Sequence, residues 1–248
     1  MPPSRSLILC ATPRTGSTLL CALLAASGRA GRPESWYRAE DRAEYQAAWG
    51  VASGDAAAFL AAAIRAGSDG TGCFGLRIQA ATLPSLLSEL RGLFGDNPDR
   101  SLLECAFGPC SFVYIRRRDD VAQAVSRLKA EVSQVWHLDG SEGPPLASAS
   151  YDSNRLDAFR TEAATGNALW EDWFSQTGIR PERLVYEDFS AEPEKTVRGL
   201  LNRLGIALPR GRDLAVPNRR MADAESRAWA ARYRAERGLP GSGVHDAL

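Results

Sequence analysis

The sequence lacks both an excess of charge of one sign and any long apolar run. Its 30 basic residues balance its 30 acidic residues, so no global charge favours binding to nucleic acid or to a membrane surface. No apolar stretch approaches the roughly 18 residues that a membrane-spanning helix needs, and no separate signal peptide precedes the first apolar run. We therefore expect a cytoplasmic protein with neither a nucleic-acid partner nor a transmembrane segment.

Histidine is scarce, and the cysteines lack the spacing of a metal site. The two histidines are His137 and His245, and the five cysteines form no metal-binding pairs. An odd cysteine count, with several thiols in apolar runs, is typical of a reduced protein with buried thiols. We expect no bound metal. His137, beside Trp136, is either a general base or, as a lone histidine more often is, a packing or hydrogen-bonding residue.

Length and composition are those of a folded protein. With 248 residues, 44% of them hydrophobic, and no clear linker, we expect a single domain over 1–248. Alternating strand and helix patterns predict an α/β fold with a central parallel β-sheet flanked by helices. A Gly/Ser/Pro-rich stretch predicts a mobile loop near 138–150. Strands are expected at 7–11, 74–78, 112–115 and 182–189, and helices at 45–49, 56–66, 83–94, 155–176, 193–204 and 219–237.

The first apolar run leads through a short loop into a helix. Leucines recur at helical spacing after Gly16, and the junction carries Arg14, Thr15, Ser17 and Thr18. Such a loop points backbone N–H groups and the positive end of the helix dipole at one spot, so the pattern predicts an anion site. The alternative is a plain turn with Arg14 in solvent. The Gly-Lys-Ser/Thr of the usual nucleotide P-loop is missing.

A second cluster of charge follows the strand expected at 112–115. Three arginines, Arg116 to Arg118, lie at its carboxyl end, where open α/β sheets bind ligands. Asp119 or Asp120 caps the next helix, and Ser126 lies about two turns into it. An arginine at the strand end and a serine on that helix can converge on one phosphate. Alternatively, the arginines pair with nearby acids at the surface.

These two clusters resemble the motifs of sulfotransferases that use 3′-phosphoadenosine-5′-phosphosulfate (PAPS). The stretch 12–20 resembles their phosphosulfate loop, and 117–126 resembles their 3′-phosphate motif. The stretches 28–37 and 184–189, together with Trp136, look like the bacterial trehalose 2-sulfotransferase-like branch. The resemblance runs from about residue 7 to about residue 233 and implies a P-loop-type α/β sandwich.

The resemblance implies a role for each residue of the two clusters. Arg14 would contact the phosphosulfate oxygens and the charge that develops on the leaving group, and Gly16, with the backbone and hydroxyls of Thr15, Ser17 and Thr18, would form the cradle. Arg117 or Arg118, together with Ser126, would hold the 3′-phosphate. PAPS would be the co-substrate, adenosine 3′,5′-bisphosphate the product, and no metal would be required. The acceptor would be a carbohydrate or glycolipid, and the family suggests a homodimer.

The residue that would activate the acceptor hydroxyl departs from the family pattern. That branch carries a catalytic Glu two residues after the Pro of its Gly-x-Pro motif, and this position is Ser35 here. Glu34, one residue earlier, or His137 would take over as base, or activity is lost or altered. Arg32 and Arg38 motivate the hypothesis of an acceptor with some negative charge. The alternatives to a sulfotransferase are a P-loop small-molecule kinase and a non-catalytic PAPS- or nucleotide-binding protein.

Overall fold

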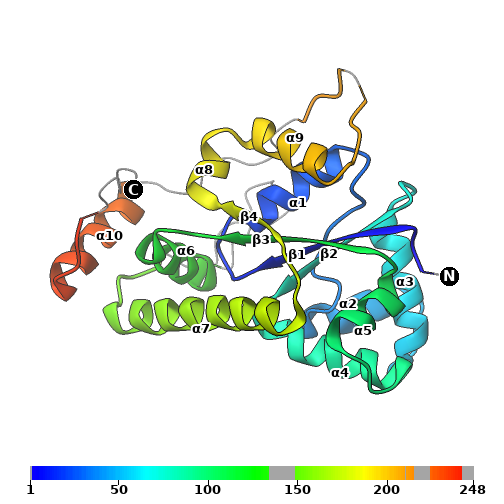
Figure 1. Ribbon diagram of the computed structural model, residues 1–248. Coiled ribbons are helices and arrows are strands. Elements are labelled where there is room, and N and C mark those ends of the chain that lie inside the picture. Colours follow the sequence, from blue (N-terminus) through cyan, green and yellow to red (C-terminus); the bar gives the residue numbers. More distant parts are fainter. Residues whose placement is uncertain (1, 134–148, 210, 215–223, 242–248) are drawn as a thin grey trace.

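A computed structural model describes residues 2–133, 149–209, 211–214 and 224–241 of the chain. Within them lies a parallel four-stranded sheet with the strand order β2-β1-β3-β4 (Figure 1). Its strands are β1 (Arg5–Ala11), β2 (Cys73–Gln79), β3 (Cys110–Arg116) and β4 (Glu182–Val185). The predicted parallel sheet is confirmed, and the loops after its strands gather at one edge.

Helices cover both faces of the sheet (Figure 1). Helices α1 and α9 pack on one face, and α3, α4, α5 and α7 pack on the other. The helices are α1 (Ser17–Ala26), α2 (Arg42–Trp49), α3 (Ala56–Ser68), α4 (Leu83–Phe94), α5 (Asp99–Phe107), α6 (Asp120–Ser133), α7 (Ser153–Thr177), α8 (Tyr186–Ala191), α9 (Pro193–Arg203) and α10 (Ala224–Arg237), with 3₁₀ turns at Ala39–Asp41 and Ala80–Thr82. The fold is therefore the predicted α/β sandwich.

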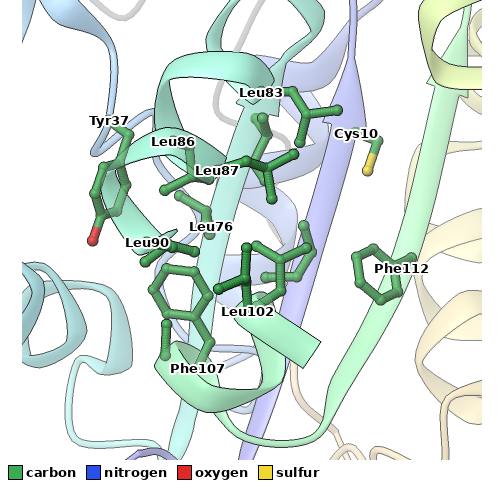
Figure 2. Close-up of a cluster of buried hydrophobic side chains, with 14 of the residues drawn as sticks. Cys10, Tyr37, Leu76, Leu83, Leu86, Leu87, Leu90, Leu102, Phe107 and Phe112 are labelled. Carbon is green, nitrogen blue, oxygen red and sulfur yellow. The ribbon is translucent and has the colours of Figure 1, made fainter. Parts of the chain in front are cut away.

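The central strand β1 shows why its sequence is a continuous apolar run. Side chains alternate along a strand, so Leu7 and Leu9 enter the cluster under α1 and α9, while Ile8 and Cys10 enter the opposite cluster. All four are completely buried. Burial of each leucine or isoleucine contributes about 1.5–3 kcal/mol. In Figure 2, leucines of α4 gather around Leu76 of β2 within this second cluster.

Helix α1 begins and ends where its sequence indicates. Its apolar residues recur at helical spacing, so Leu20, Leu23 and Leu24 are buried against the sheet. Ser27 caps the carboxyl end, and Gly28 follows with a left-handed backbone at φ 62°. The amino end of α1 lies at Ser17, directly after the loop predicted to bind an anion.

One expectation for secondary structure was wrong, one helix was not expected, and one expected loop lies outside the described residues. The strand expected at 182–189 ends at Val185, because Tyr186–Ala191 forms the helix α8. Helix α5, which the sequence reading missed, buries Leu102, Leu103, Ala106 and Phe107 against β2 and β3. The loop predicted near 138–150 falls on 134–148, outside the described residues, as do Trp136 and His137. No helix among the described residues is both long and apolar enough to cross a membrane.

Candidate active site

The loop between β1 and α1, residues 12–16, is held in a sharply bent backbone. Arg14 has a φ of 66° and Gly16 a φ of 80°, both in the left-handed region that side chains with a Cβ rarely adopt. A Cβ on Gly16 would lie 2.5 Å from Cδ2 of Tyr186. Only glycine therefore fits at position 16, because the Tyr186 ring fills the space that a side chain would take.

The hydroxyls of this loop and of the first turn of α1 have different surroundings. Thr15 is completely buried, and its Oγ1 donates to the Thr12 carbonyl at 2.9 Å, so it stabilises the bend itself. Ser17 is buried at the first turn of α1, whose unpaired N–H groups and dipole favour an anion. Thr18 accepts a hydrogen bond from Arg77, as described below.

The two clusters predicted from the sequence meet in the structure. Arg14 Nε donates to Ser126 Oγ at 3.0 Å, although the residues are 112 positions apart. Ser126 lies on α6, which starts after β3, and β3 pairs in parallel with β1. Adjacent parallel strands end at the same edge of the sheet, so the β1–α1 loop and the start of α6 face each other.

The three arginines after β3 are separated by the structure. Arg117 donates to the Arg14 carbonyl at 3.4 Å, and only 11% of its side chain is exposed. Arg118 is 54% exposed and pairs with Asp188 at 3.1 Å. Arg116 ends β3 in an exposed position. Arg117 thus lies against the β1–α1 loop, with its Nε 3.9 Å from Glu187 Oε1, whereas the more exposed Arg118 pairs with Asp188 at the surface.

Two residues of helix α8, Tyr186 and Glu187, contact the arginine segment that follows β3. The Arg117 guanidinium stacks over the Tyr186 ring, with its carbon 4.5 Å from the ring centre. The Glu187 carboxylate accepts hydrogen bonds from the backbone N–H groups of Arg118 and Asp119, at 3.0 and 3.1 Å. Asp119 in turn caps α6 by accepting from Ala122 N at 2.8 Å. Tyr186 therefore contacts both Gly16 and Arg117.

Arg77 on β2 connects the first turn of α1 to the segment that carries Glu34. Its Nη1 donates to Thr18 Oγ1 at 2.9 Å, and its Nε donates to Ser35 Oγ at 2.8 Å. Its Nη2 lies 3.5 Å from Glu34 Oε2. Because only 12% of the Arg77 side chain is exposed, these contacts are weakly screened by solvent.

The segment around Glu34 lies along the outer edge of β2. Glu34 forms a parallel bridge with Leu76, and Arg77 N donates to the Glu34 carbonyl at 2.9 Å. The approach is close because β2 has glycine at position 75, where a Cβ would lie 2.4 Å from Pro33 N. The Glu34 carboxylate is 37% exposed, whereas Ser35 is buried. Of these two residues, Glu34 is therefore the one that a bound molecule can reach.

Burial and charge in this region also act on two neighbouring groups. The pKa of the Cys21 thiol is raised to about 12, because burial disfavours the thiolate more than Arg77 favours it. The pKa of Tyr45, on α2, is also raised, by burial first and then by Glu34. Cys21 is thus an inert packing residue, and Tyr45 lies within the electrostatic influence of the Glu34 carboxylate.

Arg38, one of the two arginines that motivate the hypothesis of an acceptor with some negative charge, lies beside acidic side chains. Arg38 pairs with Glu40 at 3.3 Å and with Asp41 at 3.3 Å, so its charge is balanced locally. Sequence reasoning gave no role to Arg77 or Tyr186. The signal for Arg77 was a charged residue inside an apolar strand, which marks a partner nearby. Among the described residues, no group of three His, Cys, Asp or Glu could hold a metal ion.

Comparisons with known proteins agree with these motifs. The model of a family described as Stf0 sulphotransferase matches residues 6–236. The trehalose 2-sulfotransferase of Mycobacterium tuberculosis (strain Erdman) is 26% identical over 265 residues, covering 95% of this chain and 98% of that protein. The trehalose 2-sulfotransferase of Mycolicibacterium smegmatis is 27% identical over 271 residues, covering 96% and 98%.

Solved structures with a similar chain trace include two further bacterial proteins. The sulfotransferase domain of the Synechococcus PCC 7002 olefin synthase has 16% sequence identity and a TM-score of 0.46, covering 100% of this chain and 91% of that one. A sulfotransferase from Alicyclobacillus acidocaldarius has 13% identity and a TM-score of 0.48, covering 98% of both chains. Since the family match extends from β1 into the last turn of α10, this protein belongs to the Stf0 sulphotransferase family.

Proposed function

We propose that this sulfotransferase moves a sulfuryl group from PAPS to a hydroxyl of a carbohydrate or glycolipid. The observation that supports this best is the contact between Arg14 and Ser126, with Arg117 beside them. It brings a loop suited to the phosphosulfate end of the donor next to a cluster suited to the 3′-phosphate. ATP has no 3′-phosphate and would leave the second cluster without a ligand.

The residues present fit such a donor. Arg14 and Arg117 supply planar guanidinium groups, which bind phosphate and sulfate oxygens with several parallel hydrogen bonds. The first turn of α1 supplies N–H groups and a favourable dipole. Of the two arginines considered for the 3′-phosphate, we assign Arg117, because it lies against the β1–α1 loop with 11% of its side chain exposed, whereas Arg118 is 54% exposed and lies away from the loop.

Sulfuryl transfer resembles phosphoryl transfer in needing mainly positioning and charge stabilisation. The new bond joins the acceptor oxygen to sulfur, and the bond between sulfur and the bridging phosphate oxygen breaks. Negative charge then grows on the leaving adenosine 3′,5′-bisphosphate. Arg14, fixed by its bent backbone and by Ser126, donates to this charge without reorganisation.

The acceptor must lose a proton as its oxygen attacks. We assign the general base to Glu34, whose carboxylate is exposed enough to reach a ligand, and not to the buried Ser35. Arg77 contacts Thr18 through Nη1 and Glu34 through Nη2, so one guanidinium group links the base to the first turn of α1. The proton of the acceptor hydroxyl passes to Glu34 and then to solvent.

Titration calorimetry tests the donor. Adenosine 3′,5′-bisphosphate should bind more tightly than ATP with magnesium; tighter binding of ATP would instead support a kinase. Transfer of labelled sulfate from PAPS to a panel of sugars and glycolipids tests catalysis. Donor binding with no transfer to any member would favour a non-catalytic binding protein.

The Glu34→Gln variant tests the base. We expect its turnover to fall by about 10²–10⁴-fold with the affinity for adenosine 3′,5′-bisphosphate preserved. Ser35→Ala is the matched neighbour and should retain far more activity. Unchanged turnover in Glu34→Gln would remove the assignment.

A further inference from the structure

Gln123 on α6 is a buried polar residue without a role in the chemistry above. Only 2% of it is exposed. It precedes Ser126 by three positions, so the two side chains lie on the same face of α6, the face turned to the β1–α1 loop.

The side-chain amide of Gln123 donates two hydrogen bonds to the first half of that loop. Its Nε2 donates to the Pro13 carbonyl at 2.6 Å and to Thr12 Oγ1 at 3.2 Å. A carbonyl only accepts hydrogen bonds, so the amide nitrogen must face Pro13 and the side chain cannot be flipped. Gln123 therefore joins α6 to the loop at a second place besides the Ser126–Arg14 contact.

Packing alone does not explain a glutamine at this position. Gln123 Oε1 is buried and has no hydrogen-bond partner among the described residues. A buried carbonyl without a partner is unfavourable, and a methionine of similar length would avoid that cost. What methionine cannot supply are the two donated hydrogen bonds, so these are the property that distinguishes glutamine here.

Thr12 also contacts α7, through Asn167. Thr12 Oγ1 donates to Asn167 Oδ1 on α7 at 3.4 Å, and Tyr114 on β3 donates to the same oxygen at 2.9 Å. A methyl of Thr12 also faces Gly166 of α7, where a Cβ would lie 2.8 Å away. Hydrogen bonds thus hold the start of the loop to α6 and α7, and Arg14 follows with a left-handed backbone that is strained for a residue with a Cβ.

We infer that Gln123 is a positioning residue that sets the distance between the β1–α1 loop and α6. This inference rests on the proposed function, in which the loop binds the 5′ end of the donor and α6 the 3′-phosphate. A ligand with both anionic ends fits only when that distance is right. A ligand with the 5′-phosphate alone tolerates a shifted loop.

A ligand-free experiment tests the positioning itself. Hydrogen–deuterium exchange of peptides covering residues 11–19 should become faster in Gln123→Met, while peptides from α4 and α9 keep their wild-type exchange. Gln176→Met, an exposed glutamine of α7, is the control and should change neither. Wild-type exchange of the loop in Gln123→Met would overturn the inference, whatever the protein binds.

A pair of ligands tests the distance. Gln123→Met should weaken adenosine 3′,5′-bisphosphate by about tenfold, as expected for lost hydrogen bonds that order a site, and adenosine 5′-monophosphate by much less. Equal loss for both ligands would mean that Gln123 does not set the spacing. If the wild-type protein binds neither ligand, the proposed function fails, and the exchange experiment still decides the positioning role.

The Gln123→Glu variant gives a signature that general destabilisation would not. Its buried carboxyl would face the Pro13 carbonyl, so it can donate only when protonated, and its pKa would be raised. Affinity for adenosine 3′,5′-bisphosphate, relative to wild type at each pH, should therefore recover as the pH falls from 8 to 5.5. In Gln123→Met the ratio should stay flat. A flat ratio in Gln123→Glu would contradict the donated bond to Pro13.

Discussion

Arg14 Nε and Ser126 Oγ lie 3.0 Å apart although 112 residues separate them in the chain. The parallel pairing of β1 with β3 produces this contact, since it places the loop after one strand beside the helix after the other. The site therefore sits between two central strands, with Arg14 held by its own bent backbone at one end and by Ser126 at the other.

Arg14→Ala should lower kcat by about 10²–10³-fold, the usual loss when a donor to developing charge is removed. Arg14→Lys keeps the charge but cannot donate to Ser126 and to a ligand in the same fixed geometry, so it should be intermediate. Single-turnover transfer of labelled sulfate measures the effect. A wild-type rate in Arg14→Ala would refute the role.

Arg77→Lys should lower kcat by roughly tenfold or more, because one ammonium group cannot replace separate bonds to Thr18, Ser35 and Glu34. Arg42→Lys is the control, since Arg42 is also part-buried and paired, with Glu89, but lies outside the site. Steady-state kinetics with both substrates varied distinguish them. Equal losses in the two variants would show that Arg77 acts through stability alone.

Gly16→Ala should destabilise the fold and weaken donor binding. Two causes add: the left-handed φ of 80°, and a Cβ only 2.5 Å from Tyr186. The control is Gly54→Ala, because Gly54 has a φ of 85° and nothing within 4 Å of its Cβ position, and it should cost about 1–2 kcal/mol. Urea unfolding of both variants isolates the clash. If they unfold alike, the Tyr186 contact is not restrictive.

We expect the stability that Asp157 contributes by binding α10 to depend on pH. Hydrogen bonds from Arg237 and then Tyr233 hold the pKa of Asp157 at about 2, below its value in an unfolded chain. A lowered folded pKa contributes stability that is present above about pH 4 and is lost as the pH falls toward 2. Asp157→Asn should therefore be less stable than wild type at pH 6, with the difference shrinking toward pH 3.

Urea unfolding at several pH values measures that difference. Asp172→Asn changes an exposed acid on the same helix and should show no such trend. A gap between Asp157→Asn and wild type that stays constant from pH 6 to pH 3 would contradict the assignment.

Sequence patterns predicted the sheet and most helices because burial on both sides makes strands apolar and one-sided burial makes helices periodic. They failed at Tyr186–Ala191, whose Tyr and Phe favour a strand by composition. There the tertiary structure decides, because Glu187 satisfies backbone N–H groups ahead of α6 and Tyr186 fills the space beside Gly16. Such contacts join residues about 70 or more positions apart and leave no local signal.

The candidate site was predictable to the extent that its residues follow strands. Arg14 and Ser126 could be expected to approach each other, because both follow strands of one parallel sheet. The choice between Arg117 and Arg118 could not be made, since it depends on the direction of each side chain at the end of β3. The contacts of Arg77 depend on the register that pairs Leu9 with Arg77 and on the Glu34–Leu76 bridge.

Through that bridge, the segment carrying Glu34 also covers part of the edge of the sheet. β2 is the last strand on its side of the sheet, and a strand in that position exposes unpaired backbone groups that invite pairing with another chain. The segment that would receive the acceptor covers part of this edge. Substitutions that displace this segment would therefore also uncover the edge of β2 and favour its pairing with another chain.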